Sequence, residues 1–295
     1  MEDRTLAGQV ELLNMRHHTV AFQGEHGAFS EEAARRYFQN RITPVPVKTF
    51  EDVFRLVDRG RARHGIIPIE NSLFGSIHQN YDLLLKYHLS ITGEIKLRVV
   101  HALLVNQGVS LPQVKFIYSH PQALGQCARF LSGLRRVEVV AGYDTAGAAR
   151  NIKEEGRRDA AAIASLEAAR VYGLKILKKG IESDHRNFTR FLLLSKKKGD
   201  APSRLGRIKT SVVFSMKNIP GSLHNALGVF AMRGINLHKI ESRPLAGRPW
   251  EYLFYLDFQG SGTGEACRNA INHLKEITSY LKILGSYREG KTVGA

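Results

Sequence analysis

The sequence has little cysteine, little tryptophan and no long apolar segment, and each scarcity excludes a class of protein. Its two cysteines, Cys127 and Cys267, lack the spacing of a metal site or a redox motif, so we expect reduced, packed side chains. No apolar run could cross a bilayer, and residues 1–18 lack the apolar core of a signal peptide. We therefore predict a soluble, cytoplasmic protein with no membrane partner, in which residues 1–18 are a short lead-in.

Acidic residues are also scarce, because 27 Asp and Glu face 43 Lys and Arg and leave a formal net charge of +16. Such an excess raises nucleic acid as a partner, which would show salt-sensitive binding. The excess is spread along the chain, since residues 200–295 hold 13 basic and 7 acidic side chains. The tight run Lys196–Lys198 has no aromatic stacking motif around it and is typical of a solvated linker. We predict no nucleic-acid partner, and a diffuse field that attracts small anions.

Metal ligation is the least supported kind of site. The 12 histidines are scattered, and none has the spacing of a zinc motif with another histidine or with cysteine. We predict no metal.

Residues 19–195 alternate short apolar runs with helical segments, a pattern typical of a parallel sheet covered on both faces. Strands are expected at 19–22, 64–69, 114–118, 137–140, 160–164 and 174–177, with one long extended stretch at 91–104. Helices are expected after a cap at Ser30, at 50–57, from about 76, from 121, at 145–152 with Asp144 as cap, and at 165–172.

Polar loops follow several of these strands, where ligands bind in open α/β sheets. The loop Gly24–Phe29 leads into a helix N-terminus and can offer backbone N–H groups to an anion. Asn71 and Ser72 suit a carboxylate or hydroxyl, but they can also cap the next helix. Gln122 and Gln126 share one helical face.

The stretch Asn187–Phe191 carries the most informative polar residues, because it precedes a buried apolar run, Leu192–Leu194. Thr189 can donate and accept a hydrogen bond, and Arg190 is a fixed cation. A cavity lining and a strand entry with satisfied polar groups are equally compatible with this stretch. Arg190 in particular can contact substrate or pair with an acid such as Glu70 or Asp184.

Beyond the Gly- and Lys-rich segment 196–206 the order of elements changes to βαββαβ, which predicts a ferredoxin-like sandwich. Its expected strands and helices are 209–216, 223–230, 236–241, 251–258, 266–277 and 281–284, with a turn at 246–249. One face of the sheet is left open, and pairing with a second subunit would cover it.

Five motifs occur in a recognisable order: Gly24-x-x-Gly27-x-Phe29-Ser30, Pro68-Ile69-Glu70-Asn71-Ser72, Ser119-His120-Pro121-Gln122, Asn187-x-Thr189-Arg190-Phe191 and Glu241-Ser242-Arg243-Pro244. In this order they resemble the bacterial prephenate dehydratases that carry a C-terminal ACT regulatory domain. The resemblance covers residues 19–287. It implies a two-lobed catalytic unit similar to type II periplasmic binding proteins, followed by a ferredoxin-like ACT domain.

The resemblance also implies domain limits and an activity. The catalytic domain would be 19–198 (lobe 1 about 19–97 and 181–198, lobe 2 about 98–180), the linker 199–207 and the ACT domain 208–288. The implied reaction converts prephenate to phenylpyruvate, CO2 and water in phenylalanine synthesis, without a cofactor. L-phenylalanine would regulate it from the ACT domains of a homodimer or homotetramer.

The motifs place these roles on individual residues. Catalytic roles fall on Thr189, Asn71, Ser119 and Gln126. Substrate-binding roles fall on Glu70, Ser72, Gln122, Arg190, Phe191, Gly27 and Ser30. The L-phenylalanine site is expected at Asn218, Pro220, Gly221, Ser222, Leu223, Glu241, Ser242, Arg243 and Pro244.

Two departures and two alternatives accompany this interpretation. The family's Gly-Ala-Leu-Val is Gly221-Ser222-Leu223-His224 here, which bears on the affinity for L-phenylalanine. Residues 1–18 cannot hold the chorismate mutase helices of some relatives, so a monofunctional enzyme is expected. Arogenate dehydratase is an alternative of the same class, which competition kinetics would distinguish. An amino-acid sensor without turnover is an alternative of another class.

Overall fold

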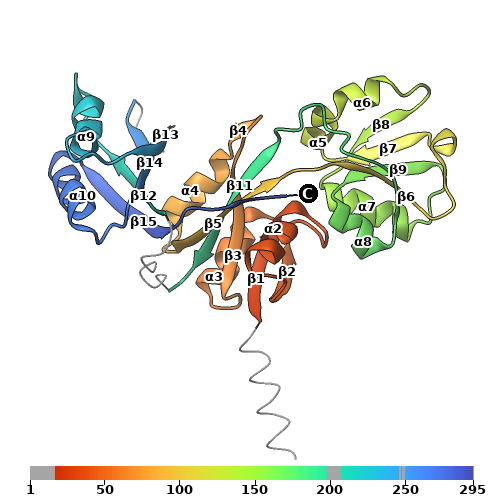
Figure 1. Cartoon of the computed structure of the whole chain (residues 1–295), viewed down its shortest axis with the longest axis horizontal. Helices are drawn as coiled ribbons and strands as arrows, with labels where there is room; N and C mark the ends of the chain where they lie inside the picture. Colours follow the sequence, from red (N-terminus) through yellow and green to blue (C-terminus); the bar gives the residue numbers. More distant parts are fainter. Residues whose placement is uncertain (1–16, 198–206, 246, 248–249, 295) are drawn as a thin grey trace, which may run out of the picture. The chain divides into compact units, whose positions relative to one another are not determined.

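The computed structural model describes residues 17–197, 207–245, 247 and 250–294, which form two compact units (Figure 1). The first unit falls within Met1–Lys86, Ile95–Leu192 and Lys291–Ala295, and the second within Tyr87–Glu94 and Leu193–Gly290. Most of the expected lead-in and linker, and the turn at 246–249 except Gly247, lie outside the described residues. In the described part of the chain, no helix is both long and apolar enough to span a membrane.

The first lobe is a sheet in the order β16-β5-β11-β3-β1-β2, with β4 paired to β3. Its strands are β1 (His18–Gln23), β2 (Ile42–Val47), β3 (His64–Asn71), β4 (Gly75–Ser76), β5 (Ser90–Arg98), β11 (Phe188–Ser195) and β16 (Thr292–Val293). Its helices are α2 (Phe29–Tyr37), α3 (Phe50–Asp58) and α4 (His78–Lys86). The fully buried strand residues Val20, Phe22 and Ile66 are consistent with the interior positions of β1 and β3 in this sheet.

Three details of this lobe differ from expectation. Strand β2 was not predicted, since Pro44 and Pro46 argue against a strand; they are tolerated because β2 is an edge strand that pairs only with β1. Ser30 does not cap α2, whose N-cap is Ala28. Helix α4 begins at His78 rather than about 76, because Gly75 and Ser76 pair with β3.

The second lobe is a sheet in the order β10-β6-β9-β7-β8. Its strands are β6 (Ala102–Val105), β7 (Phe116–Ser119), β8 (Glu138–Ala141), β9 (Ala160–Ala164) and β10 (Lys175–Lys179). Its helices are the 3-10 turn η1 (Leu111–Gln113), α5 (Pro121–Gln126), α6 (Ala128–Ser132), α7 (Thr145–Glu154) and α8 (Leu166–Tyr172). Asp144 caps α7 as expected, because its carboxylate accepts from the Gly147 N–H.

Two crossings connect the lobes. The extended stretch expected at 91–104 is interrupted, because residues 99–101 separate β5 from β6. The chain returns between β10 and β11 through residues 180–187. The two crossings touch each other, since the Val99 N–H donates to the Asn187 carbonyl at 2.8 Å.

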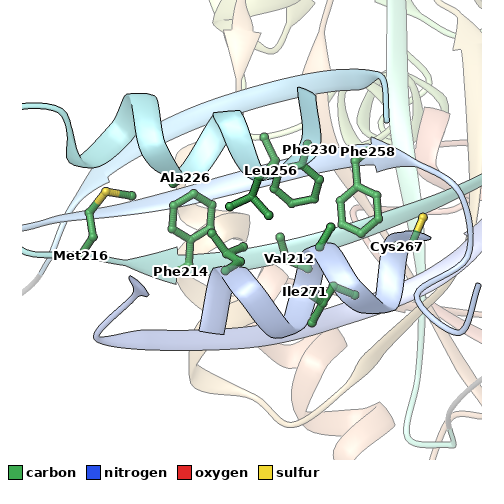
Figure 2. Packing of buried hydrophobic residues seen from close by; sticks show 12 residues of the cluster. Val212, Phe214, Met216, Ala226, Phe230, Leu256, Phe258, Cys267 and Ile271 are labelled. Atoms are coloured by element: carbon green, nitrogen blue, oxygen red, sulfur yellow. The ribbon is translucent and has the colours of Figure 1, made fainter. Parts of the chain in front are cut away.

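The second unit has the expected βαββαβ order. It consists of β12 (Ile208–Ser215), α9 (Ser222–Ala231), β13 (Leu237–Pro244), β14 (Tyr252–Gln259), α10 (Glu265–Ile277) and β15 (Tyr280–Arg288), in the antiparallel sheet order β13-β14-β12-β15. Both helices cover one face of the sheet, and the buried side chains between them include Phe214, Phe230 and Phe258 (Figure 2). This apolar layer is the core of the unit.

The other face of this sheet is partly covered by the chain itself. Segment Tyr87–Glu94 belongs to the second unit, and the Lys209 ammonium lies 3.0 Å from the Glu94 carboxylate. The backbone of this segment approaches Gly285 so closely that a Cβ there would lie 2.1 Å from the Ile91 carbonyl oxygen.

Candidate active site

A cavity of about 460 Å³ lies in the first unit and is lined by residues of both lobes. Asn71, Thr189 and Phe191 come from strands β3 and β11 of the first lobe, and Gln122 and Gln126 from helix α5 of the second. Five of the residues predicted for the site therefore meet here, and Ser30 lines the cavity as well.

Strand alternation decides which neighbours reach the cavity. Successive side chains of a strand point to opposite faces, so Thr189 and Phe191 line the cavity and Arg190 does not. At the end of β3, Asn71 likewise lines the cavity and its neighbour Glu70 does not. Arg190 Nη1 lies 3.7 Å from Glu70 Oε2, so the structure favours the ion pair over the substrate contact that we predicted for both residues.

Asp184, the other acid considered for Arg190, has a different partner. Its carboxylate pairs with the Arg186 guanidinium at 2.8 Å. Hydrogen bonds from the side chain and backbone of Arg186 lower the pKa of Asp184 to about 2.

Five side chains form a continuous hydrogen-bonded series along the cavity, which we call the amide relay: Thr189, Asn71, Asn187, Gln126 and His101. Asn71 Nδ2 donates to Thr189 Oγ1 at 3.0 Å and to Asn187 Oδ1 at 2.8 Å. Asn187 Nδ2 donates to Gln126 Oε1 at 2.9 Å, and His101 Nε2 lies 2.5 Å from the same oxygen. All five side chains are buried.

Ser72 and Ser119 were predicted for the site but hold backbone groups instead. The Ser119 hydroxyl is fully buried and donates to the Ile163 carbonyl at 2.6 Å, between strands β7 and β9. The Ser72 hydroxyl donates to the Arg186 carbonyl at 2.7 Å and accepts from the Phe188 N–H at 2.9 Å. Neither residue lines the cavity, and their predicted roles stay predictions.

Gly27 also differs from its predicted role. Its N–H donates to the Glu31 carboxylate at 2.9 Å, and its carbonyl accepts from the Ser165 hydroxyl at 2.6 Å. A Cβ at this φ of +84° would lie 2.6 Å from the Ala168 Cα. Gly27 therefore allows the close approach of helix α8 to the first lobe, and its N–H already donates to the Glu31 carboxylate.

Positive potential at the cavity comes mainly from helix ends. The lining includes the first residues of α2, α3, α5 and α7, or the residues that cap them, and the partial positive charge of each N-terminus favours an anion. Lys48 adds a full charge at the rim, where it is exposed. Asp144 is the acid of the lining, and burial raises its pKa.

The sequence interpretation missed His101, Lys48 and Tyr143, and it quoted Asn187 without a role. His101 follows an apolar strand, and no spacing marks it; burial lowers its pKa. Tyr143 contacts the first lobe, because its hydroxyl donates to the Glu25 carboxylate at 2.8 Å. Burial raises the pKa of Tyr143 to about 12, so it stays neutral.

The residues predicted for L-phenylalanine lie in two elements of the second unit. Gly221, at φ +82°, is the N-cap of α9, and no side chain of the described residues caps this helix. Asn218 and Leu223 flank it and are exposed. Glu241–Pro244 form the end of β13.

Neither a metal cluster nor a reactive thiol is present among residues 17–197, 207–245, 247 and 250–294. No group of three or more His, Cys, Asp or Glu side chains there could hold a metal ion. Both cysteines are free and buried, as expected, and burial raises the pKa of the Cys127 thiol to about 12.

Two family models match the chain. The prephenate dehydratase model matches residues 20–199, and the ACT domain model matches residues 210–264. Among curated proteins, the chain is 47% identical to "Arogenate dehydratase/prephenate dehydratase 2, chloroplastic" of Arabidopsis thaliana over 91% of its length and 72% of the relative's. It is also 47% identical to "Arogenate dehydratase 2" of Petunia hybrida, with coverage of 91% and 71%.

Solved structures agree with these matches. A prephenate dehydratase from Arthrobacter aurescens in complex with L-Phe has a TM-score of 0.84 at 31% identity, covering 92% of this chain and 90% of that one. A structure described as GqqA, a novel type of quorum quenching acylase, has a TM-score of 0.85 at 34% identity, with coverage of 92% and 98%.

The relatives also correct one expectation. Because the curated relatives named here are plant proteins, the bacterial assignment made from the motifs is not supported. Fold, motifs and family models agree on the family. The chain belongs to the prephenate dehydratase family, with a two-lobed catalytic unit like a type II periplasmic binding protein and a ferredoxin-like ACT domain, and it is a carbon–oxygen lyase.

Proposed function

We propose that this chain converts prephenate to phenylpyruvate, CO2 and water in the cavity between its two lobes, without a cofactor. The observation that carries the proposal is the Thr189 hydroxyl, which lines the cavity and already accepts a hydrogen bond from Asn71. Its own proton can then be donated to a substrate oxygen.

The reaction needs little covalent help. The bond between C1 and its carboxylate breaks, CO2 leaves, and the electron pair enters the ring. The C4–O bond breaks, the oxygen takes its electron pair and one proton, and it departs as water. Because the ring becomes aromatic, the protein mainly orients the substrate and assists the leaving oxygen with a hydrogen-bond donor.

The charges of the substrate fit the cavity's potential. The side-chain carboxylate can lie against the helix N-termini and Lys48. The ring carboxylate loses its charge as CO2 leaves, so a fixed cation beside it would stabilise the ground state and slow the step. Arg190 on the opposite face of β11 is compatible with this requirement.

Turnover of prephenate by wild type, Thr189→Ser and Thr189→Ala tests the proposal. Thr189→Ala should lose on the order of a hundredfold or more in kcat, as for removal of a positioned donor. Thr189→Ser keeps the hydroxyl and should lose much less. Thr210→Ala in the second unit controls for the substitution itself. A Thr189→Ala enzyme as active as wild type would remove the hydroxyl from the mechanism.

Arogenate is a second candidate substrate, because the curated relatives are named as arogenate dehydratases or as enzymes of both kinds. It differs from prephenate by an amine in place of the side-chain ketone. Competition kinetics with both substrates gives the ratio of the two kcat/KM values. The sensor without turnover is set aside, because the family is enzymatic.

We also propose feedback by L-phenylalanine at the ACT domain, with the ligand between paired domains of a homodimer or homotetramer. The N-terminus of α9 after Gly221 can receive the amino-acid carboxylate. Segment Tyr87–Glu94 covers part of the sheet face opposite the helices, and pairing with a second copy would cover the rest. Calorimetry that detects no L-phenylalanine binding would remove the regulatory claim and leave the catalytic one. The cytoplasmic location, the monofunctional character and the domain limits stay predictions.

A further inference from the structure

We propose that Asn71 is a positioning residue, which sets the direction of every hydrogen bond in the amide relay, so that Thr189 must donate its proton into the cavity and His101 carries its proton on Nε2. The proposal rests on the proposed function, in which Thr189 assists the leaving oxygen. It adds a reason why that hydroxyl donates and does not merely accept.

The direction of the relay originates at two backbone groups. The N–H groups of Leu73 and Phe74 donate to Asn71 Oδ1 at 3.0 and 3.1 Å. A backbone N–H can only donate, so this oxygen is the acceptor and the side-chain orientation of Asn71 is determined. Its NH2 group therefore faces Asn187 and Thr189 as a donor.

The same logic passes along the next two members. Asn187 Oδ1 accepts from Asn71, so Asn187 Nδ2 must donate to Gln126 Oε1. Gln126 Oε1 then accepts from both sides, and the proton of His101 must lie on Nε2. His101 Nδ1 is buried and has no hydrogen-bond partner among the described residues, which fits a neutral ring without a proton there. Burial also lowers the pKa of His101, which favours the same neutral ring.

At the Thr189 end of the relay, the hydroxyl proton of Thr189 has no acceptor among the other relay members. Thr189 Oγ1 accepts from Asn71, and the hydrogen bonds of the described residues include no acceptor for its own O–H within the protein. The residue lines the cavity, where the acceptor is the substrate. A hydroxyl that rotated to donate to Asn71 would meet a donor, so only the orientation toward the cavity is satisfied.

The relay also crosses between the lobes. Asn71 and Thr189 belong to the first lobe and Gln126 to helix α5 of the second, while His101 and Asn187 lie in the two crossings. Asn187 is thus the member that joins the two sides.

Asn71→Asp tests the direction, because it changes one NH2 group to an oxygen without changing shape. The new oxygen would face Thr189 Oγ1 and Asn187 Oδ1, so the Thr189 hydroxyl would turn to donate to it and the amide of Asn187 would reverse. The amide of Gln126 would reverse in turn, its NH2 would face His101, and the proton of His101 would move to Nδ1. We expect kcat to fall at least about tenfold, with a smaller change in KM, since the donor at Thr189 is misdirected and the cavity wall is kept.

Two matched variants separate direction from charge and from packing. Gln126→Glu adds the same negative charge within the relay and keeps an acceptor toward both neighbours, so it should lose less kcat than Asn71→Asp and keep the Nε2–H form of His101. Asn106→Asp makes the same change at a structural amide of the second lobe, where Nδ2 donates to the carbonyls of Ile152 and Arg157. It should lower stability and leave kcat within about twofold.

Imidazole ¹⁵N NMR reads the tautomer of His101 independently of turnover. The Nε2–H form in wild type and its loss in Asn71→Asp support the proposal. The Nδ1–H form in wild type overturns it, and so does Asn71→Asp activity equal to that of Asn106→Asp. Failure of wild type to convert either prephenate or arogenate overturns the proposed function, and the NMR result then still decides the direction of the relay.

Discussion

The two units of this chain bury polar side chains by opposite chemistry. In the first unit the amide relay consists of neutral groups, each donor facing an acceptor. In the second unit Lys209 and Glu94 form a charged pair, with side chains that are 4% and 0% exposed. The relay lies along the wall of the cavity in the first unit. The charged pair attaches segment Tyr87–Glu94 to strand β12 within the second unit.

This difference teaches what each cluster can tolerate. A buried charge is costly to desolvate, and only its partner offsets the cost, so the pair depends on both charges being present. A neutral network depends instead on which atom donates, since a reversed amide leaves two unmatched groups. Substitutions that change charge should therefore act most strongly on stability in the second unit, and substitutions that change donor to acceptor should act on catalysis in the first.

The largest effect on stability is expected for Glu94→Gln. The substitution keeps an acceptor for the Gly290 N–H, which lies 3.1 Å from Glu94 Oε1, but it leaves Lys209 buried without a counter-charge. Breaking a buried pair in this way costs about 3–5 kcal/mol. Urea unfolding of wild type and variant measures the change in the free energy of unfolding.

Glu94→Gln with Lys209→Met is the matched control. It removes both charges and keeps the aliphatic stem, so it should be more stable than the single variant. If the single variant loses less than about 1 kcal/mol, the pair does not contribute as its burial indicates.

The next effect concerns an ionisable group that the first unit keeps neutral. His64 Nε2 lies 3.2 Å from His18 Nδ1, and its own Nδ1 is buried without a partner among the described residues. Burial, followed by the nearby His18 and Arg63, lowers the pKa of His64 from 6.5 to about 4. Between pH 6.5 and 4 the unfolded chain binds this proton and the folded chain does not, so stability falls as the pH falls through this window.

The expected loss from His64 is about 3 kcal/mol and levels off below pH 4, where both states are protonated. The free energy of unfolding of His64→Gln should therefore depend less on pH than that of wild type in this window. His88→Gln, at an exposed position, should keep the wild-type slope. Equal slopes for His64→Gln and wild type would contradict the lowered pKa.

Much of the architecture could be predicted from the sequence because it depends on local patterns. Apolar runs such as Ala160–Ala164 predicted strands such as β9. The change to a βαββαβ order of elements after residue 206 predicted the second unit. Strand β2 was missed because its prolines outweighed its apolar residues. Strand β16 was missed because its pairing with β5 joins residues far apart in the sequence.

The site was predictable at the level of motifs and less so at the level of side-chain direction. The period of two in a strand already implied that Thr189 and Arg190 face opposite sides. This signal could have separated Arg190 and Glu70 from the residues that line the cavity. Ser119 could not be removed in this way, because its hydroxyl turns to the carbonyl of a neighbouring strand, a tertiary contact. His101 enters the relay only through folding, so no local pattern marks it.

The smallest effect tests whether burial, and not distance, sets the strength of the charged pair. Lys86 and Glu51 approach to 2.6 Å, closer than the 3.0 Å of Lys209 and Glu94, but their side chains are 61% and 35% exposed. Water and salt screen such a pair, so Glu51→Gln should cost less than about 1 kcal/mol in the same urea experiment, and less still at high salt. If Glu51→Gln were as destabilising as Glu94→Gln, burial would not set the strength of these ion pairs. The contrast between the two units would then no longer follow from burial.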